Sequence, residues 1–366
     1  MTKRCVHILL AALVVWVACE RRPLEEPSEA VGIRVDVNVK AVTNVNTNIR
    51  NSIHLYGTNA SLWDEKLDQL HPELMRVLVY DPETDKLLAQ SFISNMEVNE
   101  EGETVFSGNL GISYGNFNFL VYNFDTPTTQ VTAENTESGI LAYTSEISPA
   151  MRTRLLGTKA DDDSEPDGYA GITIRYEPEH LMVGNERDVR ISPHDTMVVI
   201  HTEASTVVDT YYLQVRVKGL QFASTATAVI SGLSPSNHIG LNERTVDSPA
   251  AVAFEMKKAK DTELDGDNQD ILCAVVNTFG KIDSISSELF VTFNVFDTAG
   301  NLLQYKANLD RVFDSELARN YHWLILDDSV LVIDIPDPGQ GQQPSSGGGF
   351  QPQVDDWEEE NGEIAL

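Results

Sequence analysis

The sequence has only three cysteines in 366 residues, and they offer no intrachain disulfide. Cys5 and Cys19 border the apolar run at the amino terminus, so Cys273 alone remains for the body of the chain. Cys273 lies in the apolar stretch 271–276, where a single thiol is typical of a small buried residue. We therefore expect stability to come from buried apolar surface. The chain is long enough for that, and its length suggests two domains.

Basic residues are also scarce. Lysine and arginine together number 26 against 56 aspartates and glutamates, which gives a net charge of -30. A chain of this charge is repelled by nucleic acid and by anionic lipid surfaces. The composition therefore excludes a nucleic-acid partner, and any contact with a membrane has to come from a lipid and not from a basic patch.

Long hydrophobic runs are absent except near the amino terminus. Residues 8–17 are apolar but too short to span a bilayer, and Lys3 and Arg4 precede them, as in a signal peptide. The following Val-Ala-Cys resembles a bacterial lipoprotein cleavage box, although Trp16 stands where that box prefers leucine or valine. The resemblance implies cleavage after Ala18 and acylation of Cys19, with the chain tethered at the outer membrane or cell surface. An ordinary secretory signal is the alternative.

Motifs for catalysis or metal binding are missing from the sequence. It contains no His-Glu-x-x-His, Cys-x-x-Cys or Gly-x-Ser-x-Gly pattern. Two acidic loops, 163–168 and 261–266, space oxygens as a calcium loop does, but Ile174 and Leu272 stand where its bidentate acid belongs. His194 and Asp195 could form a triad with nearby serines, as chance pairs do in any long chain. We predict no enzyme, no cofactor and no metal site, and a surface hydrolase is the least favoured alternative.

Alternation of apolar and polar residues is the main structural signal that is present. Ile33, Val35, Val37 and Val39 alternate with polar residues, as a half-buried strand requires, and residues 213–217 repeat the pattern. Segments 76–92 and 293–305 each predict two strands joined by a turn. Short strands and frequent turns predict an all-β protein made of β-sandwiches.

The sequence divides the chain into five parts. The boundary between two domains is placed near Pro193, after the strand expected around residues 189–191, and the proline-, glutamine- and glycine-rich stretch after 335 marks the start of a linker. We expect a signal peptide at 1–18, a tether at 19–30, an N-terminal β-sandwich at 31–193, a C-terminal β-sandwich at 194–335 and a linker with an acidic tail at 336–366. Phe350, Val354 and Trp357 make the tail a candidate docked or donor strand, with a solvated tail as the alternative.

Several strings resemble the fimbrillin-like lipoproteins of Bacteroidales, including a branch known only as a domain of unknown function. They are residues 19–25, 115–124, 206–211 and 347–357. The resemblance implies two tandem transthyretin-like Greek-key β-sandwiches and a role as a pilus stalk, tip or anchor subunit. It also implies partners, namely other fimbrial subunits or further copies of the chain, which join by strand addition.

In that family an arginine-specific protease removes the first strand of polymerising subunits, and a neighbour's peptide fills the groove. By this resemblance the strand that contains Ile33, Val35, Val37 and Val39 is the candidate exchange strand, and Arg50 is a candidate cleavage site. An ordinary surface arginine is the alternative interpretation of Arg50.

Glycan binding is the second functional hypothesis. Polysaccharide-uptake systems also use tandem β-sandwiches on a lipid tether, and aromatic side chains stack on sugar rings. Trp63, Trp323 and Trp357 are the candidate rings. Trp63 and Trp323 lie among leucines and are expected in the core, which leaves Trp357 as the most exposed. A host or plant glycan is therefore the alternative ligand.

Overall fold

The structure consists mainly of β-strands. The computed structural model describes residues 33–41, 72–124, 126–158, 168–258, 270–282 and 289–339. Strands make up 57% and helices 8% of it, so the all-β prediction is confirmed. Among the described residues, no helix is both long enough and apolar enough to cross a bilayer.

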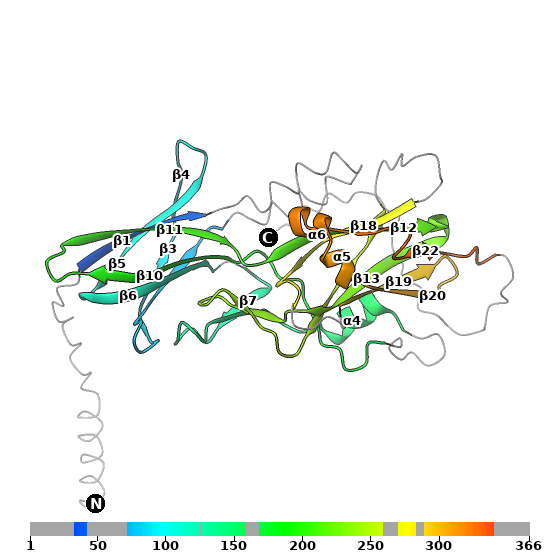
Figure 1. Cartoon of the computed structure of the whole chain (residues 1–366), viewed down its shortest axis with the longest axis horizontal. Coiled ribbons are helices and arrows are strands. Elements are labelled where there is room, and N and C mark those ends of the chain that lie inside the picture. The colour runs from blue at the N-terminus through cyan, green and yellow to red at the C-terminus, as the bar shows by residue number, and fades with distance from the viewer. Residues whose placement is uncertain are drawn as a thin grey trace, which may run out of the picture.

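Eight strands form the largest sheet, on the left in Figure 1. In spatial order they are β3 (Leu87–Ile93), β2 (Met75–Tyr80), β6 (Gly115–Asn123), β10 (Met182–Ile191), β11 (Met197–Thr206), β1 (Ile33–Ala41), β5 (Thr104–Ile112) and β4 (Asn95–Val98). Strands β3 and β4 follow each other in sequence but lie at opposite ends of this order. The sheet therefore folds over until its two ends meet.

One buried cluster fills the space inside the folded sheet. Val37 of β1 and Phe106 of β5 belong to the same cluster as Val79 of β2 and Phe119 of β6. Gly108 of β5 lets the two ends approach closely, because a Cβ atom built there would lie 2.0 Å from Cγ2 of Ile93. The first body is thus a two-layered sandwich formed by one continuous sheet.

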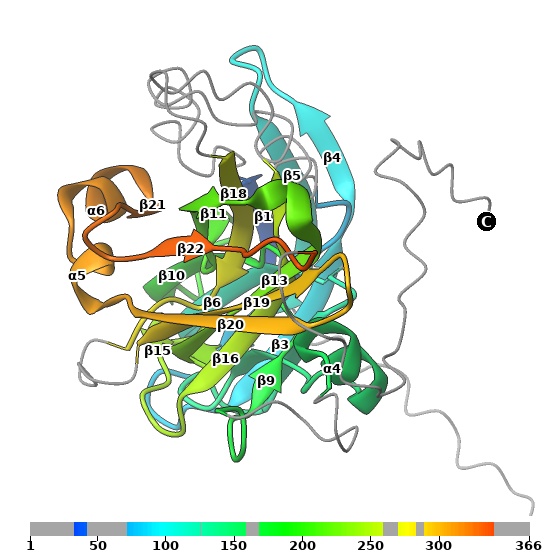
Figure 2. The ribbon, with the colours of Figure 1, turned by 90° about the vertical axis from the view of Figure 1, so that its right-hand side faces the viewer.

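Two five-stranded sheets form a second sandwich, on the right in Figure 1. The first contains β17 (Lys257–Lys258), β18 (Asp270–Thr278), β12 (Asp209–Lys218) and β21 (Trp323–Leu326), with β22 (Val332–Asp334) paired to β12. The second contains β20 (Leu302–Asn308), β19 (Phe290–Asp297), β13 (Ala223–Leu233), β16 (Ala250–Glu255) and β9 (Ile174–Arg175). Figure 2 shows the strands of this second sheet lying side by side in one layer.

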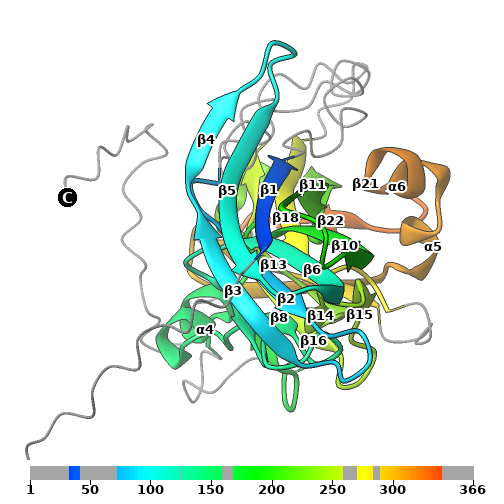
Figure 3. The ribbon, with the colours of Figure 1, turned by 90° about the vertical axis from the view of Figure 1, so that its left-hand side faces the viewer.

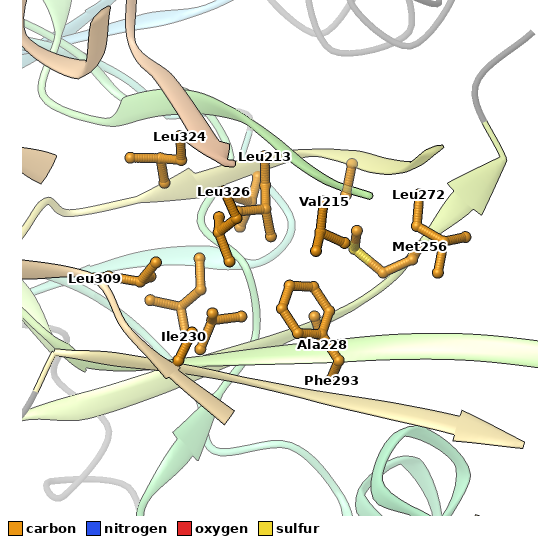
Figure 4. Packing of buried hydrophobic residues seen from close by; sticks show 14 of the residues in the cluster. Leu213, Val215, Ala228, Ile230, Met256, Leu272, Phe293, Leu309, Leu324 and Leu326 are labelled. Carbon is orange, nitrogen blue, oxygen red and sulfur yellow. The ribbon is translucent and has the colours of Figure 1, made fainter. Parts of the chain in front are cut away.

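The core of the second sandwich lies between these two sheets (Figure 4). Leu213 and Val215 of β12 face Ile230 of β13 and Phe293 of β19, and all four are fully buried. Alternate residues point to opposite faces of a strand, so these four side chains share the inner faces, while their buried neighbours Tyr212 and Val229 pack on the outer faces.

A small sheet covers the outer face of the first sandwich. It contains β15 (Glu243–Arg244), β14 (Ser236–His238), β8 (Leu141–Thr144) and β7 (Thr129–Thr132). Ala142 of β8 and Ile239 pack against Tyr80 and Leu120 of the large sheet. This contact joins strands from early and late parts of the chain.

The helices are short. In the described part of the chain they are α4 (Pro149–Leu156), α5 (Asp310–Phe313), α6 (Glu316–Tyr321) and the 3-10 turn η2 (Leu220–Phe222). Helix α6 follows Ser315, whose hydroxyl caps its first turn by accepting from the Ala318 N–H at 3.1 Å. Helix α4 was not predicted from the sequence, because its apolar residues show no helical periodicity. Ser148 and Pro149 were the available start signal.

The two predicted strand–turn–strand units are confirmed as β2–β3 and β19–β20. Each turn begins with an aspartate that accepts backbone N–H groups. Asp81 accepts from Glu83 at 2.8 Å, and Asp297 accepts from Ala299 at 2.9 Å and from Asn301 at 2.8 Å. Such side chain–backbone bonds are the physical reason that aspartate starts turns.

Strand pairing does not follow the predicted boundary at Pro193. Strand β11 lies after that residue but pairs with β1 and β10 in the first sheet, whereas β9 lies before it and pairs with β16 in the second. The chain leaves the eight-stranded sheet after β6 and returns to it at β10, and it leaves it for the last time between Thr206 and Asp209, where β12 of the second sandwich begins. Local composition could not show this, because the partner of β11 is more than 150 residues away in sequence. The division into two domains stays a prediction.

Candidate functional site

Strand β1, which contains the predicted exchange residues, lies inside the eight-stranded sheet. It pairs in parallel with β11, from Arg34 opposite Met197 onward, and antiparallel with β5, from Ile33 opposite Ile112 onward. Ile33, Val35, Val37 and Val39 all point into the core, and the three valines are fully buried. Both backbone edges of β1 and one whole face of its side chains are therefore in use.

The surroundings of β1 are those of a slot for one strand. Its neighbours β5 and β11 do not pair with each other, because β1 separates them. If β1 were withdrawn, each neighbour would present a row of free N–H and C=O groups, and the core would open at the sites of four apolar side chains. An incoming strand with the same alternation could satisfy both rows at once.

Lys40 ties β1 to both neighbours on the outer face of the sheet. Its Nζ atom lies 2.6 Å from Oε1 of Glu103, beside the start of β5, and 3.2 Å from Oε1 of Glu203 on β11. Hydrogen bonds to these carboxylates raise the pKa of Lys40, and the bond from Lys40 lowers the pKa of Glu103. Glu203 is exposed and Lys40 and Glu103 are partly exposed, so the tie adds more to the specificity of the strand register than to stability.

The Lys40 tie predicts a small acid dependence of stability. The pKa of Glu103 is lowered in the folded chain, so its ionised carboxylate adds to the free energy of unfolding. This contribution is fully present above the unfolded-state pKa of about 4.3 and is lost as the pH falls through the folded-state pKa. We expect Lys40→Met to remove this part of the pH dependence of the unfolding free energy, and the exposed control Lys86→Met to keep it. NMR titration of Glu103 checks the cause. An unchanged pKa of Glu103 in Lys40→Met would contradict it.

A polar hollow of about 510 Å³ lies beside the Lys40 tie. Its lining includes Asn38, His201 and Glu186 as well as the three charged residues of the tie, and none of its lining residues is Phe, Tyr or Trp. The hollow therefore offers mainly hydrogen-bonding and charged groups.

The other predicted site residues fall largely outside the described part of the chain. These are Ala18, Cys19, Arg50, Trp63, Phe350, Val354 and Trp357. The calcium-like loop 261–266 and most of the loop 163–168 also lie there. Within the described ranges, no group of three or more His, Cys, Asp or Glu residues is placed to hold a metal ion.

Residues considered for chemistry have structural roles where the structure describes them. Asp195 accepts the Ser192 N–H at 2.7 Å, and Ser192 Oγ accepts the His194 N–H at 3.3 Å, so these residues form a turn and not a triad. Trp323 is fully buried, as expected. Cys273 is buried in β18, and burial raises the pKa of its thiol to about 11, which keeps it protonated and unreactive.

His180 occupies the passage between the two sandwiches. Its Nδ1 atom lies 3.0 Å from Oγ1 of Thr206, at the end of β11, and its Nε2 atom lies 3.3 Å from Oγ1 of Thr210 on β12. Thr210 donates in turn to Oδ1 of Asn277 at 2.7 Å. This buried polar network holds the end of β11 next to β12, where the chain enters the second sandwich, and gives His180 a structural role.

Sequence reasoning missed two features of the site. The first is β11, the parallel neighbour of β1, whose sequence alternates like any other strand. The second is a partly exposed cluster in which the Arg76 guanidinium lies 5.2 Å from the ring centre of Phe92 and 5.0 Å from that of Phe124. The predicted hairpin over 76–92 brings Arg76 near Phe92. No sequence signal adds Phe124, which follows β6 and joins them only through the pairing of β2 with β6.

Comparison with known proteins identifies the family. Residues 62–255, more than half of the chain, match the family described as "Domain of unknown function (DUF5119)". The chain belongs to this family. The resemblance inferred from the sequence strings is therefore confirmed.

Named relatives are also found for this DUF5119 protein. It is 24% identical, over 69% of its length, to a Bacteroides ovatus protein named "Putative fimbrium anchoring subunit Fim4B", and it spans 60% of that relative's length. Its fold is similar to the crystal structure of a "putative adhesin" from Bacteroides ovatus, with a TM-score of 0.54, 18% identity and coverage of 86% of this chain and 94% of the other. The fimbrial anchor protein Mfa2 from Porphyromonas gingivalis matches with a TM-score of 0.42, 14% identity and coverage of 80% and 87%.

Proposed function

We propose that this DUF5119 protein is a non-catalytic subunit or anchor of a surface fimbria, which joins its partners by strand addition. The observation that carries the proposal is the position of β1, an interior strand with one apolar face between two strands that do not pair with each other. The name of the Bacteroides ovatus relative, a fimbrium anchoring subunit, supports the same role. The partners are other fimbrial subunits or further copies of the chain.

The proposed anchor is a lipid on Cys19, which would hold the protein at the outer membrane or cell surface. The support is the signal-like amino terminus and the Ala18-Cys19 junction. Each CH₂ group of an acyl chain that is buried in the bilayer contributes about 0.8 kcal/mol to the free energy of membrane binding. Two or three acyl chains would therefore keep the amino terminus in the membrane. Mass spectrometry of the mature amino terminus would detect these chains.

The proposed architecture is two tandem transthyretin-like Greek-key sandwiches. Two separate cores support it, one around Val37 and Phe119 and one around Leu213 and Phe293. The first sandwich would then carry the exchangeable strand, and the second would support it through the contacts around His180.

Strand exchange can be tested on the full chain. Cleavage at Arg50, which follows the end of β1, would leave β1 held only by non-covalent contacts. We expect a labelled peptide of residues 31–41 to replace the resident strand after treatment with an arginine-specific protease, as measured by fluorescence anisotropy. The same peptide carrying Val35→Asp and Val37→Asp should not enter, because both side chains would point into the core.

The variant Arg50→Ala is the matched control, since it leaves β1 covalently joined at that site. Exchange into Arg50→Ala equal to exchange into the cleaved parent would show that Arg50 is not the relevant site. Absence of any uptake by the cleaved chain, with β1 still bound after long incubation, would contradict strand exchange at β1.

A further inference from the structure

Strand β4 is an exposed end of the eight-stranded sheet. All four of its residues are exposed, with Met96 at 51% and Val98 at 66%, and within the described residues it pairs only with β5. Figure 3 shows β3 and β4 one after the other along the outer border of the sheet. Natural edge strands are usually protected by lysine, proline or a bulge. Between Leu88 and Val98 there is neither lysine nor proline, and Glu97 is the single charged residue.

The backbone groups that face away from β5 can be identified from the turn that follows β4. The Asn99 N–H donates to the Glu103 C=O at 2.9 Å, so these two residues form a hydrogen-bonded pair. Hydrogen-bonded and non-hydrogen-bonded pairs alternate along an antiparallel ladder. Met96, opposite Phe106, and Val98, opposite Thr104, are therefore non-hydrogen-bonded, and their N–H and C=O groups point toward the free edge.

The free edge continues onto β3 with the same alternation. The Phe124 N–H donates to the Leu74 C=O at 3.1 Å, which makes Arg76 and Tyr122 a hydrogen-bonded pair between β2 and β6. The backbone of Arg76 is thus directed to β6 and not to Phe92, its opposite residue on β3. Phe92 consequently also presents its N–H and C=O groups outward. Its side chain is exposed, as are those of Met96 and Val98.

The charge around β4 indicates what kind of strand it can accept. Glu97 on β4 and Glu100 and Glu101 in the following turn are exposed, and among the described residues none of them forms an ion pair. The nearby Lys40 is already bound to Glu103 and Glu203. A second copy of the chain, paired antiparallel through the outward groups of Met96 and Val98, would place Glu97 opposite Glu97, which is unfavourable.

We propose that β4 is an acceptor edge for an extended basic strand of a partner protein. The partner strand would pair with the outward N–H and C=O groups of Met96 and Val98 and contact their exposed side chains. Its lysine or arginine residues would lie beside Glu97 and the glutamates of the adjacent turn. This surface lies beyond the proposed function, because it is separate from the slot of β1 and binds a strand at an edge instead of inserting one between two strands.

Proline substitution tests the edge directly. The N–H group of Val98 points away from β5, so Val98→Pro removes a donor for the partner without breaking the β4–β5 ladder. The probe is a short fluorescent peptide of alternating lysine and valine, added to the full chain and followed by anisotropy. We expect saturable binding that weakens with added salt and is at least about tenfold weaker in Val98→Pro, which corresponds to about 1.4 kcal/mol.

Two controls separate strand pairing from simple attraction of a basic peptide to an acidic protein. Val98→Thr keeps the N–H group and should bind the probe like the parent chain. A probe of the same charge with N-methyl groups on alternate residues cannot pair and should bind at least tenfold more weakly. Circular dichroism and the thermal midpoint of Val98→Pro should stay close to those of the parent.

Three results would overturn the proposal. Equal binding of the parent probe to Val98→Pro, or of the N-methylated probe to the parent chain, would show attraction by charge alone. Absence of saturable binding would remove the acceptor edge. A dimer of the chain that is lost in Val98→Pro would assign the edge to a second copy. Exchange at β1, measured in the same Val98→Pro variant, should be unaffected, so failure at β4 and failure of the proposed function remain distinguishable.

Discussion

Val37→Asp is expected to unfold the first sandwich. Val37 is fully buried at the centre of β1, among Val79, Phe106 and Phe119. A carboxylate has no hydrogen-bond partner in this cluster, and burial of an unpaired charge is one of the few single changes that costs more than about 4 kcal/mol. That loss is comparable to the whole stability of many domains, about 5–15 kcal/mol. Urea denaturation followed by circular dichroism measures it.

The pH dependence of Val37→Asp follows from the same burial. The buried carboxyl group has a pKa above that of the unfolded chain, so the folded state binds the proton more tightly. Stability therefore falls as the pH rises above the unfolded-state value of about 3.9. Asn38→Asp is the matched control, because Asn38 is the next residue on β1 and faces outward. A loss in Asn38→Asp equal to that in Val37→Asp would contradict the assigned faces of β1.

Phe293→Ala is expected to have the second-largest effect, in the second sandwich. Phe293 of β19 is fully buried and faces the opposite sheet across the core (Figure 4). Removing a buried phenyl ring loses its transfer free energy and leaves a cavity, at about 3–5 kcal/mol in total. Calorimetry and urea denaturation of the variant measure the loss.

The same strand supplies a control of the same residue type. Phe290 is only partly buried, on the opposite face of β19, and its ring centre lies 4.2 Å from Nζ of Lys306. Phe290→Ala should lose about 1 kcal/mol of cation–π attraction and some apolar contact, clearly less than Phe293→Ala. Equal losses at the two positions would show that β19 does not carry its core on the face that includes Phe293.

The two sandwiches differ in what exchange at β1 would do to them. Withdrawal of β1 opens the core around Val37, whereas the core around Phe293 contains no residue of β1. The second sandwich should therefore stay folded during exchange and hold β11 in place through the polar contacts of His180 with Thr206 and Thr210. During the proposed exchange, the first sandwich would thus open while the second supports it.

Local sequence determined several features of this protein. The alternation of Ile33, Val35, Val37 and Val39 predicted one buried face of a strand, and Asp81 and Asp297 marked the turns of two hairpins that the structure confirms. These features were readable because period-two alternation and aspartate turns depend on residues close together in the chain. The all-β class could be predicted for the same reason, because short alternating strands and turns depend on neighbouring residues.

Only the tertiary structure decided which strands are neighbours. It placed β1 inside a sheet between β5 and β11 and left β4 at an open edge. It also paired β11, which follows the predicted boundary at Pro193, with β1 and β10, which precede it. Pairing between strands far apart in sequence depends on packing of the whole chain, and a strand at an edge has the same alternation as one inside a sheet. The sequence thus determined the faces of the strands, and the fold determined their order.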